Sequence, residues 1–248
     1  MLNNFELINY LYENYPIKTK SEILAELNLS WSYIQKIACI NKIKKGRNES
    51  INDNKYIKLI DYTDNISLYW IGFIIADGHI YRSNNIQINI SIKDKDYLLN
   101  IINHIGNIPF TTSKGVIRMT ISDRPTVNKL SNDFRLLSNK TKNPIVIPDF
   151  LSDDALFSLI VGFIDGDGTI NKKGHIIIKC DASWKEILEK FYLILTNDDK
   201  KFNLTSDGLS IVYILKLKKL SLIKKRAKLL NLPIMNRKWD RIYEYNKK

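Results

Sequence analysis

The chain has 248 residues, of which 44% are hydrophobic, enough to bury real cores, and this excludes a disordered protein. Thirty-eight Lys and Arg residues face 26 acidic ones, which gives a formal charge of +12 and a pI of about 9.5. Such a surplus favours a polyanionic partner such as DNA, RNA or an anionic membrane surface. The plain alternative is an enzyme from a lysine-rich proteome, because the many Asn, Ile and Lys residues would also follow from an AT-rich genome.

Secretion, zinc binding and membrane insertion have no support in the sequence. Cys39 and Cys180 are far apart in apolar contexts, which predicts two buried free thiols in a reducing compartment. No Cys/His cluster has zinc spacing. The N-terminus lacks a secretory pattern, and the longest apolar runs are far shorter than the roughly 20 residues that span a bilayer. We therefore expect no membrane partner, and a cytoplasmic (bacterial or phage) or organellar location.

Residues 1–46 are predicted to form a small helical module. "TKSE" is a capping box in which Thr19 caps a first helix. Asn28 suits the left-handed residue of a tight turn, and Ser30 can cap a second helix. The segment "EILAELNLSWSYIQKIA" resembles a helix-turn-helix, although Leu24 stands where a small residue is usual and Asn28 where glycine is usual.

The second helix of this module would carry the contacts to DNA. Tyr33, Gln35 and Lys36 are the candidate contacts, and Trp31 and Ser32 lie on the same helix. The basic tail "KIKKGR" favours DNA contact over an ordinary helical hairpin that only packs.

Residues 47–66 are predicted to be a linker, and the rest of the chain is an internal repeat with halves at 67–150 and 151–248. In each half an apolar helix ending in Asp-Gly precedes two strands, a helix, two strands and a helix. The fold class is therefore α+β, with two pseudo-symmetric αββαββα halves beside the all-α module. Helices on one face of each sheet leave the other face free.

The free face of each sheet is predicted to carry polar side chains that read base edges in a DNA major groove. Alternation in "IQINISI" and "VIRMTIS" sets the parity of the first sheet. The candidate contacts from both sheets are His79, Tyr81, Arg82, Gln87, Asn89, Ser91, Arg118, Thr120, Thr169, Asn171, Lys173, Lys179, Lys201, Asn203 and Lys216.

The two helices that end in Asp-Gly carry small residues four positions apart. These are Gly72 and Ala76 in "GFIIADG", and Gly162 and Gly166 in "GFIDGDG". Such stripes let two backbones come very close, so we expect the two helices to pack on each other. The glycines after the aspartates suit the left-handed residue that ends a helix.

This packing would bring Asp77 and Asp167, 90 positions apart in the chain, nearly into contact. Two carboxylates at helix C-termini are unfavourable, because the helix dipoles and the like charges both oppose them. A divalent cation reverses both penalties, and hard oxygen ligands suit Mg²⁺ or Mn²⁺. We expect backbone oxygens of Ala76 and Gly166 to join the two acids, at a site for phosphodiester hydrolysis.

At these motifs, "WIGFIIADG" and "IVGFIDGDG", the sequence resembles the single-chain LAGLIDADG homing endonucleases over about residues 67–242. The resemblance implies a DNA-binding saddle, with the motif helices at its centre and Asp77 and Asp167 as metal ligands. It also implies a lysine beside the scissile phosphate in each half. The matching residues are Lys140 and Lys238, with Lys142 and Arg237 as close competitors.

Asp165 stands outside this symmetry, because its counterpart in the first half is Ile75. We expect Asp165 to cap a turn or form a salt bridge, since symmetric chemistry cannot require it.

The function expected is magnesium-dependent, site-specific hydrolysis of both strands of double-stranded DNA, by a monomer with a long, partly asymmetric target. One alternative is a non-catalytic DNA-binding regulator with the same fold. The other is an RNA-binding maturase whose partner is its own intron RNA, a role that some relatives hold. Whether an intron, an intein or a free-standing gene encodes the chain stays open.

Overall fold

The computed structural model describes most of the chain and divides it into two compact units, residues 1–53 and 54–248. The residues described are 4–15, 18, 20–43, 56–81, 85–171, 175–199, 209–214 and 217–241. None of the described helices is long and apolar enough to cross a membrane.

The smaller unit consists of three helices around a core of its own. They are α1 (Asn4–Asn14), α2 (Lys20–Leu27) and α3 (Trp31–Ile40). Leu11, Ile23 and Ile34 are fully buried between them. Each helix therefore buries one apolar face against the other two.

The turn between α2 and α3 has the local geometry that the sequence predicts. Asn28 has a left-handed φ of 51°, and the Ser30 hydroxyl accepts a hydrogen bond from the Tyr33 backbone N–H at 3.4 Å, which caps α3. Thr19 lies outside the described residues. Cys39 is exposed and Cys180 is half-buried, so the prediction of two buried thiols is wrong for Cys39 and only partly met by Cys180.

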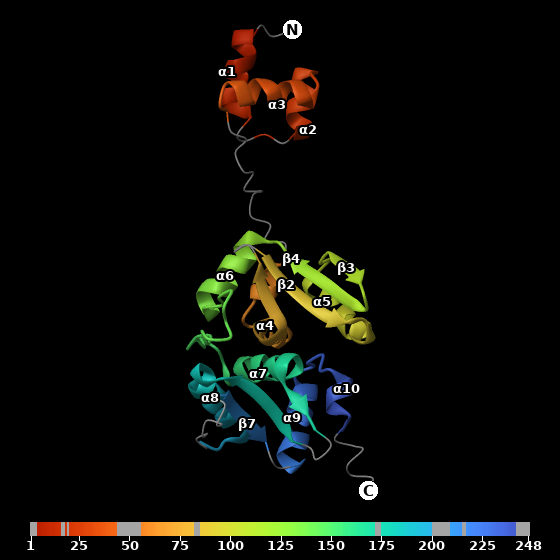
Figure 1. Cartoon of the computed structure of the whole chain (residues 1–248), viewed down its shortest axis with the longest axis vertical. Coiled ribbons are helices and arrows are strands. Elements are labelled where there is room, and N and C mark those ends of the chain that lie inside the picture. Colours follow the sequence, from red (N-terminus) through yellow and green to blue (C-terminus); the bar gives the residue numbers. More distant parts are fainter. Residues whose placement is uncertain are drawn as a thin grey trace. The chain divides into compact units, whose positions relative to one another are not determined.

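The larger unit contains two halves whose described elements run in a similar order, each beginning its repeat with a motif helix, and its α+β class is as predicted (Figure 1). The first half comprises η1 (Ile57–Ile60), α4 (Asn65–Asp77), β1 (Gly78–Tyr81), β2 (Asn85–Ser91), η2 (Ile92–Asp94), α5 (Lys95–Ile105), β3 (Phe110–Ser113), β4 (Val116–Ile121) and α6 (Arg124–Phe134). The second half comprises α7 (Asp153–Asp167), β5 (Thr169–Ile170), β6 (Ile176–Asp181), η3 (Ala182–Trp184), α8 (Lys185–Thr196), β7 (Leu209–Ile214), α9 (Leu217–Leu229) and α10 (Asn236–Trp239).

Both sheets are antiparallel. The first has the order β1-β2-β4-β3, and the described strands of the second have the order β5-β6-β7. The repeat predicts strands around 201–217; β7 is the one described there, and residues 201–208, 215 and 216 lie outside the described residues. Figure 1 shows α4 and α7 side by side between the two sheets.

Alternation of side chains gives the first sheet one apolar and one polar face. In β2 and β4, Ile88 and Met119 are buried neighbours. On the opposite face Asn89 pairs in register with Arg118, and Gln87 pairs with Thr120. The apolar face packs into the core and the polar face stays free.

The segment before α4 belongs to the larger unit from Tyr56 on. Tyr56 and Leu59 are buried in its core, and Asp64 caps α4 by accepting from the Ile66 N–H at 3.0 Å. The linker expected over 47–66 therefore differs from the structure in residues 56–66, because two apolar side chains of this polar stretch anchor it.

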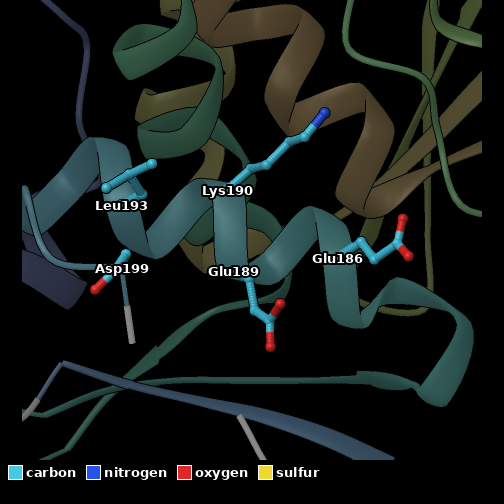
Figure 2. Close-up of a pocket in the computed structure, with 5 residues that line it drawn as sticks. All are labelled: Glu186, Glu189, Lys190, Leu193 and Asp199. Carbon is cyan, nitrogen blue, oxygen red and sulfur yellow. The ribbon is translucent and has the colours of Figure 1, made fainter. Parts of the chain in front are cut away.

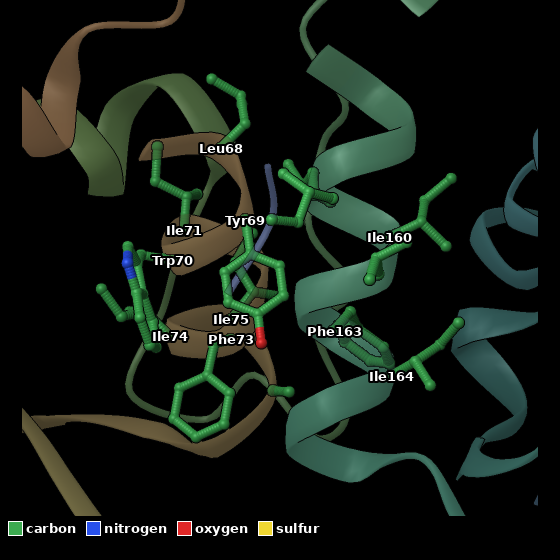
Figure 3. Packing of buried hydrophobic residues seen from close by; sticks show 14 of the residues in the cluster. Leu68, Tyr69, Trp70, Ile71, Phe73, Ile74, Ile75, Ile160, Phe163 and Ile164 are labelled. Carbon is green, nitrogen blue, oxygen red and sulfur yellow. The ribbon is translucent and has the colours of Figure 1, made fainter. Parts of the chain in front are cut away.

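The closest packing in the fold lies between α4 and α7 (Figure 3). A Cβ atom on Gly72 would lie 1.8 Å from the Leu159 carbonyl oxygen, and a Cβ on Gly162 would lie 1.8 Å from the Tyr69 carbonyl oxygen. A Cβ on Gly166 would meet the Ala76 Cβ at 2.3 Å. The two helices thus meet backbone to backbone, with the same contact made twice about a pseudo-twofold axis.

Gly162→Ala should therefore destabilise the larger unit. Even one methyl group would collide with backbone rather than with a movable side chain, and overpacking of this kind costs about 1–3 kcal/mol or more. Urea unfolding at neutral pH measures the loss of free energy.

Gly115→Asn is the matched control. Gly115 has open space around its Cα and a left-handed φ of 77°, which asparagine tolerates better than most residues. Equal unfolding free energies for Gly162→Ala and the wild type would contradict the close approach of the helices.

Candidate functional site

The two motif helices end at the same place relative to the interface, with Asp77 closing α4 and Asp167 closing α7. Gly78 and Gly168 follow them. Their φ angles are −73° and −77°, so the expectation of left-handed glycines is wrong. Glycine is needed for another reason: a Cβ there would lie 2.4 Å and 2.5 Å from the carbonyl oxygens of residues 74 and 164. The chain turns sharply into a strand beside the helix end, which no larger residue permits.

The carboxyl groups of Asp77 and Asp167 lie at the protein surface above densely packed protein. Loss of hydration raises the pKa of both, and the charge of Asp167 raises the pKa of Asp77 further. Lys140 and Lys238 oppose this shift. The four side chains therefore form one electrostatic cluster, in which the two acids are held in an unfavourable ionised pair.

The side chains of Lys140 and Lys238 reach equivalent carbonyl groups at the C-terminal ends of α4 and α7. The Lys140 ammonium donates to the carbonyl oxygens of Ile75, at 2.6 Å, and Ala76. The Lys238 ammonium donates to the carbonyl oxygens of Asp165, at 2.6 Å, and Gly166, at 3.0 Å. Each lysine thus satisfies free carbonyls at a helix C-terminus.

Both ammonium groups are half-buried, and burial lowers the pKa of each lysine, while the aspartates counteract the shift. The competing cations lie elsewhere. Lys142 is exposed, and the Arg237 guanidinium is paired with Asp94.

The donor set at the helix ends fits a hard divalent cation. Among the described residues no group of three or more His, Cys, Asp or Glu side chains is placed to hold a metal. Asp77 and Asp167 are two carboxylates, and Mg²⁺ is commonly held by one or two carboxylates while it keeps several waters. A cation between them would also relieve the repulsion that raises the pKa of Asp77.

The backbone oxygens predicted to join these acids are already engaged. The carbonyls of Ala76 and Gly166 accept hydrogen bonds from Lys140 and Lys238. A cation bound to the same oxygens would therefore lie against an ammonium group, which is unfavourable. Water and phosphate oxygens are better complements to the two carboxylates, and the backbone ligands stay a prediction.

Asp165 has a role that the sequence did not reveal. The side chain is almost fully buried, with 1% of its surface exposed. It accepts hydrogen bonds from the Tyr69 hydroxyl at 2.7 Å, the Met235 N–H at 3.0 Å and the Trp239 indole N–H at 2.8 Å. Burial raises the pKa of Asp165, and these three donors oppose the shift.

The expected cap or salt bridge at Asp165 is therefore not what the structure shows. Instead, this carboxyl joins α4 of the first half to the segment of the second half that carries Lys238. Nothing in the local sequence marks the partners, because Tyr69 and Trp239 lie 96 and 74 positions away.

A cleft of about 190 Å³ opens beside Asp167. Its lining includes Asp167, Lys140, Lys179 and Cys180. Burial raises the pKa of the Cys180 thiol to about 12, so the thiol stays protonated at neutral pH. Lys179 lies exposed on the free face of β6, which connects the cleft to the proposed base-reading surface.

A second cavity lies along α8 and has no part in this site (Figure 2). Glu186, Glu189 and Asp199 contribute carboxylates to it, but they are not arranged to hold a metal. Figure 2 shows Glu189 and Lys190 pointing to opposite sides of the helix.

The candidate DNA contacts lie where the strand parity places them. In the first sheet His79, Tyr81, Asn89, Ser91 and Arg118 are exposed, and Gln87 and Thr120 are half-buried. The Arg118 Nε donates to the Asn89 Oδ1 across two strands at 3.2 Å.

In the second half Thr169 and Lys179 are exposed. Asn171 is half-buried, and its side chain accepts from the His175 N–H at 3.0 Å, so it closes the turn between β5 and β6. On α3 of the small unit, Tyr33, Gln35 and Lys36 are exposed. Five candidates lie outside the described residues: Arg82, Lys173, Lys201, Asn203 and Lys216.

Comparison with family models and curated sequences does not assign the chain to a family. No family model matches the chain. A probable phosphoenolpyruvate synthase of Methanocaldococcus jannaschii is 26% identical over 148 residues, which are 54% of this chain but only 12% of that protein. The chain thus spans a small part of this relative, and the activity of the whole synthase does not carry over.

Solved structures show the fold. The LAGLIDADG meganuclease I-CpaMI bound to uncleaved DNA matches with a TM-score of 0.51 and 12% identity, over 73% of this chain and 89% of that one. The meganuclease I-AabMI, also bound to uncleaved DNA, matches with a TM-score of 0.48, 15% identity and coverages of 73% and 88%. The N-terminal LAGLIDADG domain of DUF199/WhiA matches with a TM-score of 0.45, 16% identity and coverages of 77% and 94%. The likeness to I-CpaMI shows that the chain shares the LAGLIDADG fold.

The raised pKa values at the helix ends predict that Asp77→Asn and Asp167→Asn each stabilise the protein at pH 7 in the absence of divalent metal. The folded state holds these protons to higher pH than the unfolded chain, so stability is lost as pH rises from about 3.9 through the raised values. Asparagine is neutral, so each variant avoids the cost of an ionised carboxylate at this position.

Thermal unfolding in EDTA should therefore show a higher Tm for each variant at pH 7, with the gap closing toward pH 4. Added Mg²⁺ should raise the Tm of the wild type more than that of either variant. Variants that melt below the wild type at pH 7 would contradict the repulsion between the acids.

Asp165→Asn should act in the opposite direction. The Met235 N–H and the Trp239 indole N–H donate to different oxygens of the Asp165 carboxyl group. The asparagine side chain has only one oxygen acceptor, and its other group is an NH₂ donor. One buried donor is left unsatisfied, which costs about 1–3 kcal/mol.

Urea unfolding measures the free energy of unfolding lost in Asp165→Asn. Asp149→Asn removes a charge at an exposed loop position and is the control. Unchanged stability in Asp165→Asn would show that these hydrogen bonds do not anchor the segment near Lys238.

Proposed function

We propose that the protein is a magnesium-dependent endonuclease that cuts both strands of a specific DNA duplex. The observation that carries this proposal is the cluster at the ends of α4 and α7. There two aspartates face an unfavourable ionised state, and two lysines bind equivalent helix carbonyls.

Asp77 and Asp167 would hold the cation through their carboxylates. Bound there, Mg²⁺ (or Mn²⁺) would supply a Lewis acid for the phosphate and a water made more acidic. A cation there would favour the ionised form of both acids, whose pKa values burial raises. A protein that merely binds DNA has no need of two carboxylates whose charges repel each other and also repel phosphate.

Lys140 and Lys238 would each lie beside one scissile phosphate. A half-buried ammonium held by two carbonyl oxygens is preorganised, and it can stabilise the negative charge that develops on a phosphate oxygen. Each lysine is fixed to the motif helix of its own half, so the duplicated unit supplies one cation for each strand.

The polar faces of the two sheets would read the bases. In the first sheet the Arg118 Nε donates to the Asn89 amide oxygen. The terminal nitrogens of this guanidinium form no hydrogen bond to the described residues and could contact a guanine edge. Exposed cations such as Lys179 would contact phosphates. Because both halves of the site are in one chain, we infer that a monomer engages a long, partly asymmetric target.

The test begins with the target. Duplexes that the protein retains from a randomised library in EDTA identify its preferred sequence. Supercoiled plasmids carrying that sequence are then incubated with Mg²⁺. Linear product supports the endonuclease, and binding without cutting would favour the regulator. Preference for an RNA containing the surrounding intron would favour the maturase.

Asp77→Asn and Asp167→Asn should each lower cleavage by roughly 100-fold or more, the scale of losing one preorganised electrostatic group. Binding in EDTA should persist, because the sheets are untouched and a charge near phosphate is removed. Plasmid cleavage and gel-shift titration at one salt concentration measure the two effects.

Asp149→Asn serves as the control and should cut like the wild type. If the two acids share one metal, both strands slow together, and if they act separately, each variant becomes a nickase for one strand. Near-normal cleavage by either variant would remove these acids from the centre.

Deletion of residues 1–53 should weaken binding and leave the chemistry intact. The small unit has its own core, and the acids and lysines of the site belong to residues 54–248. Loss of exposed Lys36 and its neighbours removes phosphate contacts, so the dependence of log K on log salt should become shallower. A truncated protein that folds but cannot cut at any enzyme concentration would contradict this division of roles.

A further inference from the structure

The segment that carries Lys140 is held from the opposite half of the larger unit. Trp184, at the end of η3, donates its indole N–H to the carbonyl oxygens of Lys140 and Thr141, both at 3.1 Å. Trp184 is buried, with 4% of its surface exposed, and its ring packs against Phe163 of α7. A rigid side chain of the second half therefore fixes the backbone of a first-half lysine.

The segment that carries Lys238 is held in the reverse direction. Asp94, at the end of η2 in the first half, accepts from the Nε and Nη2 atoms of Arg237 at 2.9 and 3.0 Å. Arg237 directly precedes Lys238 in the chain. The Asp94 side chain is only 10% exposed, and bidentate pairs of this kind are geometrically specific.

Asp94 and Trp184 are the same position in the two halves. Each ends the single 3₁₀ turn that follows the second strand of its half. They are 90 positions apart, the interval that also separates Asp77 from Asp167. The chemistry differs, a carboxylate in one half and an indole in the other, but both reach across the interface to a lysine segment.

We propose that Trp184 and the Asp94–Arg237 pair are positioning residues, which set the place of each lysine from the half that does not contain it. This inference rests on the proposed endonuclease function. It explains why the two halves must act as one body: each lysine contacts the motif helix of its own half, and the backbone behind it is braced by the other half. Loss of one brace should then disturb one lysine, and with it the cutting of mainly one strand.

Trp184→Phe tests the first brace. The variant keeps an aromatic ring in the core and removes the donating N–H. Trp70→Phe is its matched control, because Trp70 is also fully buried and its indole nitrogen has no hydrogen-bond partner among the described residues. Any effect of the smaller ring alone appears in both variants.

Asp94→Asn tests the second brace, because it keeps the shape of the side chain and removes the charged, two-bond contact with Arg237. Asp154→Asn is its control. Asp154 also pairs with an arginine, Arg226, at 2.6 Å, but both of these residues belong to the second half and neither adjoins a lysine of the site.

Amide hydrogen exchange in the absence of DNA is the first measurement. We expect exchange in residues 139–143 to quicken in Trp184→Phe, and exchange in residues 236–240 to quicken in Asp94→Asn. Each change should be roughly 2- to 10-fold, the effect of one hydrogen bond of ordinary net strength. Unchanged exchange in both variants would overturn the braces whatever the protein does.

Cutting of each strand of the selected duplex, labelled separately, is the second measurement. The ratio of the two single-turnover rates should shift in opposite directions in Trp184→Phe and Asp94→Asn, and should stay at the wild-type value in both controls. Equal slowing of both strands, or no change, would overturn the positioning role. A wild-type protein that cuts no DNA would overturn the proposed function instead, and hydrogen exchange would still decide whether the braces exist.

Discussion

The backbone contact between α4 and α7 determines most of what the larger unit can do. Gly72 and Gly162 allow carbonyl oxygens of the facing helix to approach where a Cβ would otherwise be. This contact fixes the distance and the angle between the two halves, because interiors packed this closely do not slide. Most side chains of the two helices are buried, and Asp77 and Asp167, at their C-terminal ends, are exposed.

Two unfavourable features occur together at the C-terminal ends of α4 and α7. Carbonyl groups at a helix C-terminus need donors, and paired carboxylates need cations. Lys140 and Lys238 answer the first need through hydrogen bonds to residues 75–76 and 165–166, and they lessen the second through their charge. The same lysines are in turn positioned by residues of the other half. The remaining unfavourable negative charge at the two aspartates would be relieved by a bound cation, and proposed catalytic sites of this kind commonly reduce stability.

The sequence was sufficient for the features that repeat or alternate. The period of the strands predicts which face of β2 and β4 is polar, and the duplicated Asp-Gly motif predicts that the two helices lie together. It was insufficient where a residue acts through a distant partner. Asp165 looks like a turn residue because its donors, Tyr69 and Trp239, are far away in the chain. The motif predicts a positive φ at Gly78 and Gly168, but both are extended. Glycine is required there because a Cβ atom would collide with the helix backbone. The polar composition of residues 47–66 predicts a linker and gives no sign that Tyr56 and Leu59 are buried in the core.

The central proposal is that Asp77 and Asp167 hold divalent metal at the end of the α4–α7 contact. Replacement of magnesium by Fe²⁺, followed by ascorbate and peroxide, generates hydroxyl radicals that cut the polypeptide backbone next to the bound ion, and mass spectrometry of the fragments locates the cuts without knowledge of the DNA target. The account predicts cuts near residue 77 and near residue 167 in the same protein, both competed away by Mg²⁺. In Asp77→Asn, weaker cutting at both places would show one shared ion, and weaker cutting near residue 77 alone would show separate ions. Cuts at only one of the two aspartates, or at neither, would contradict it.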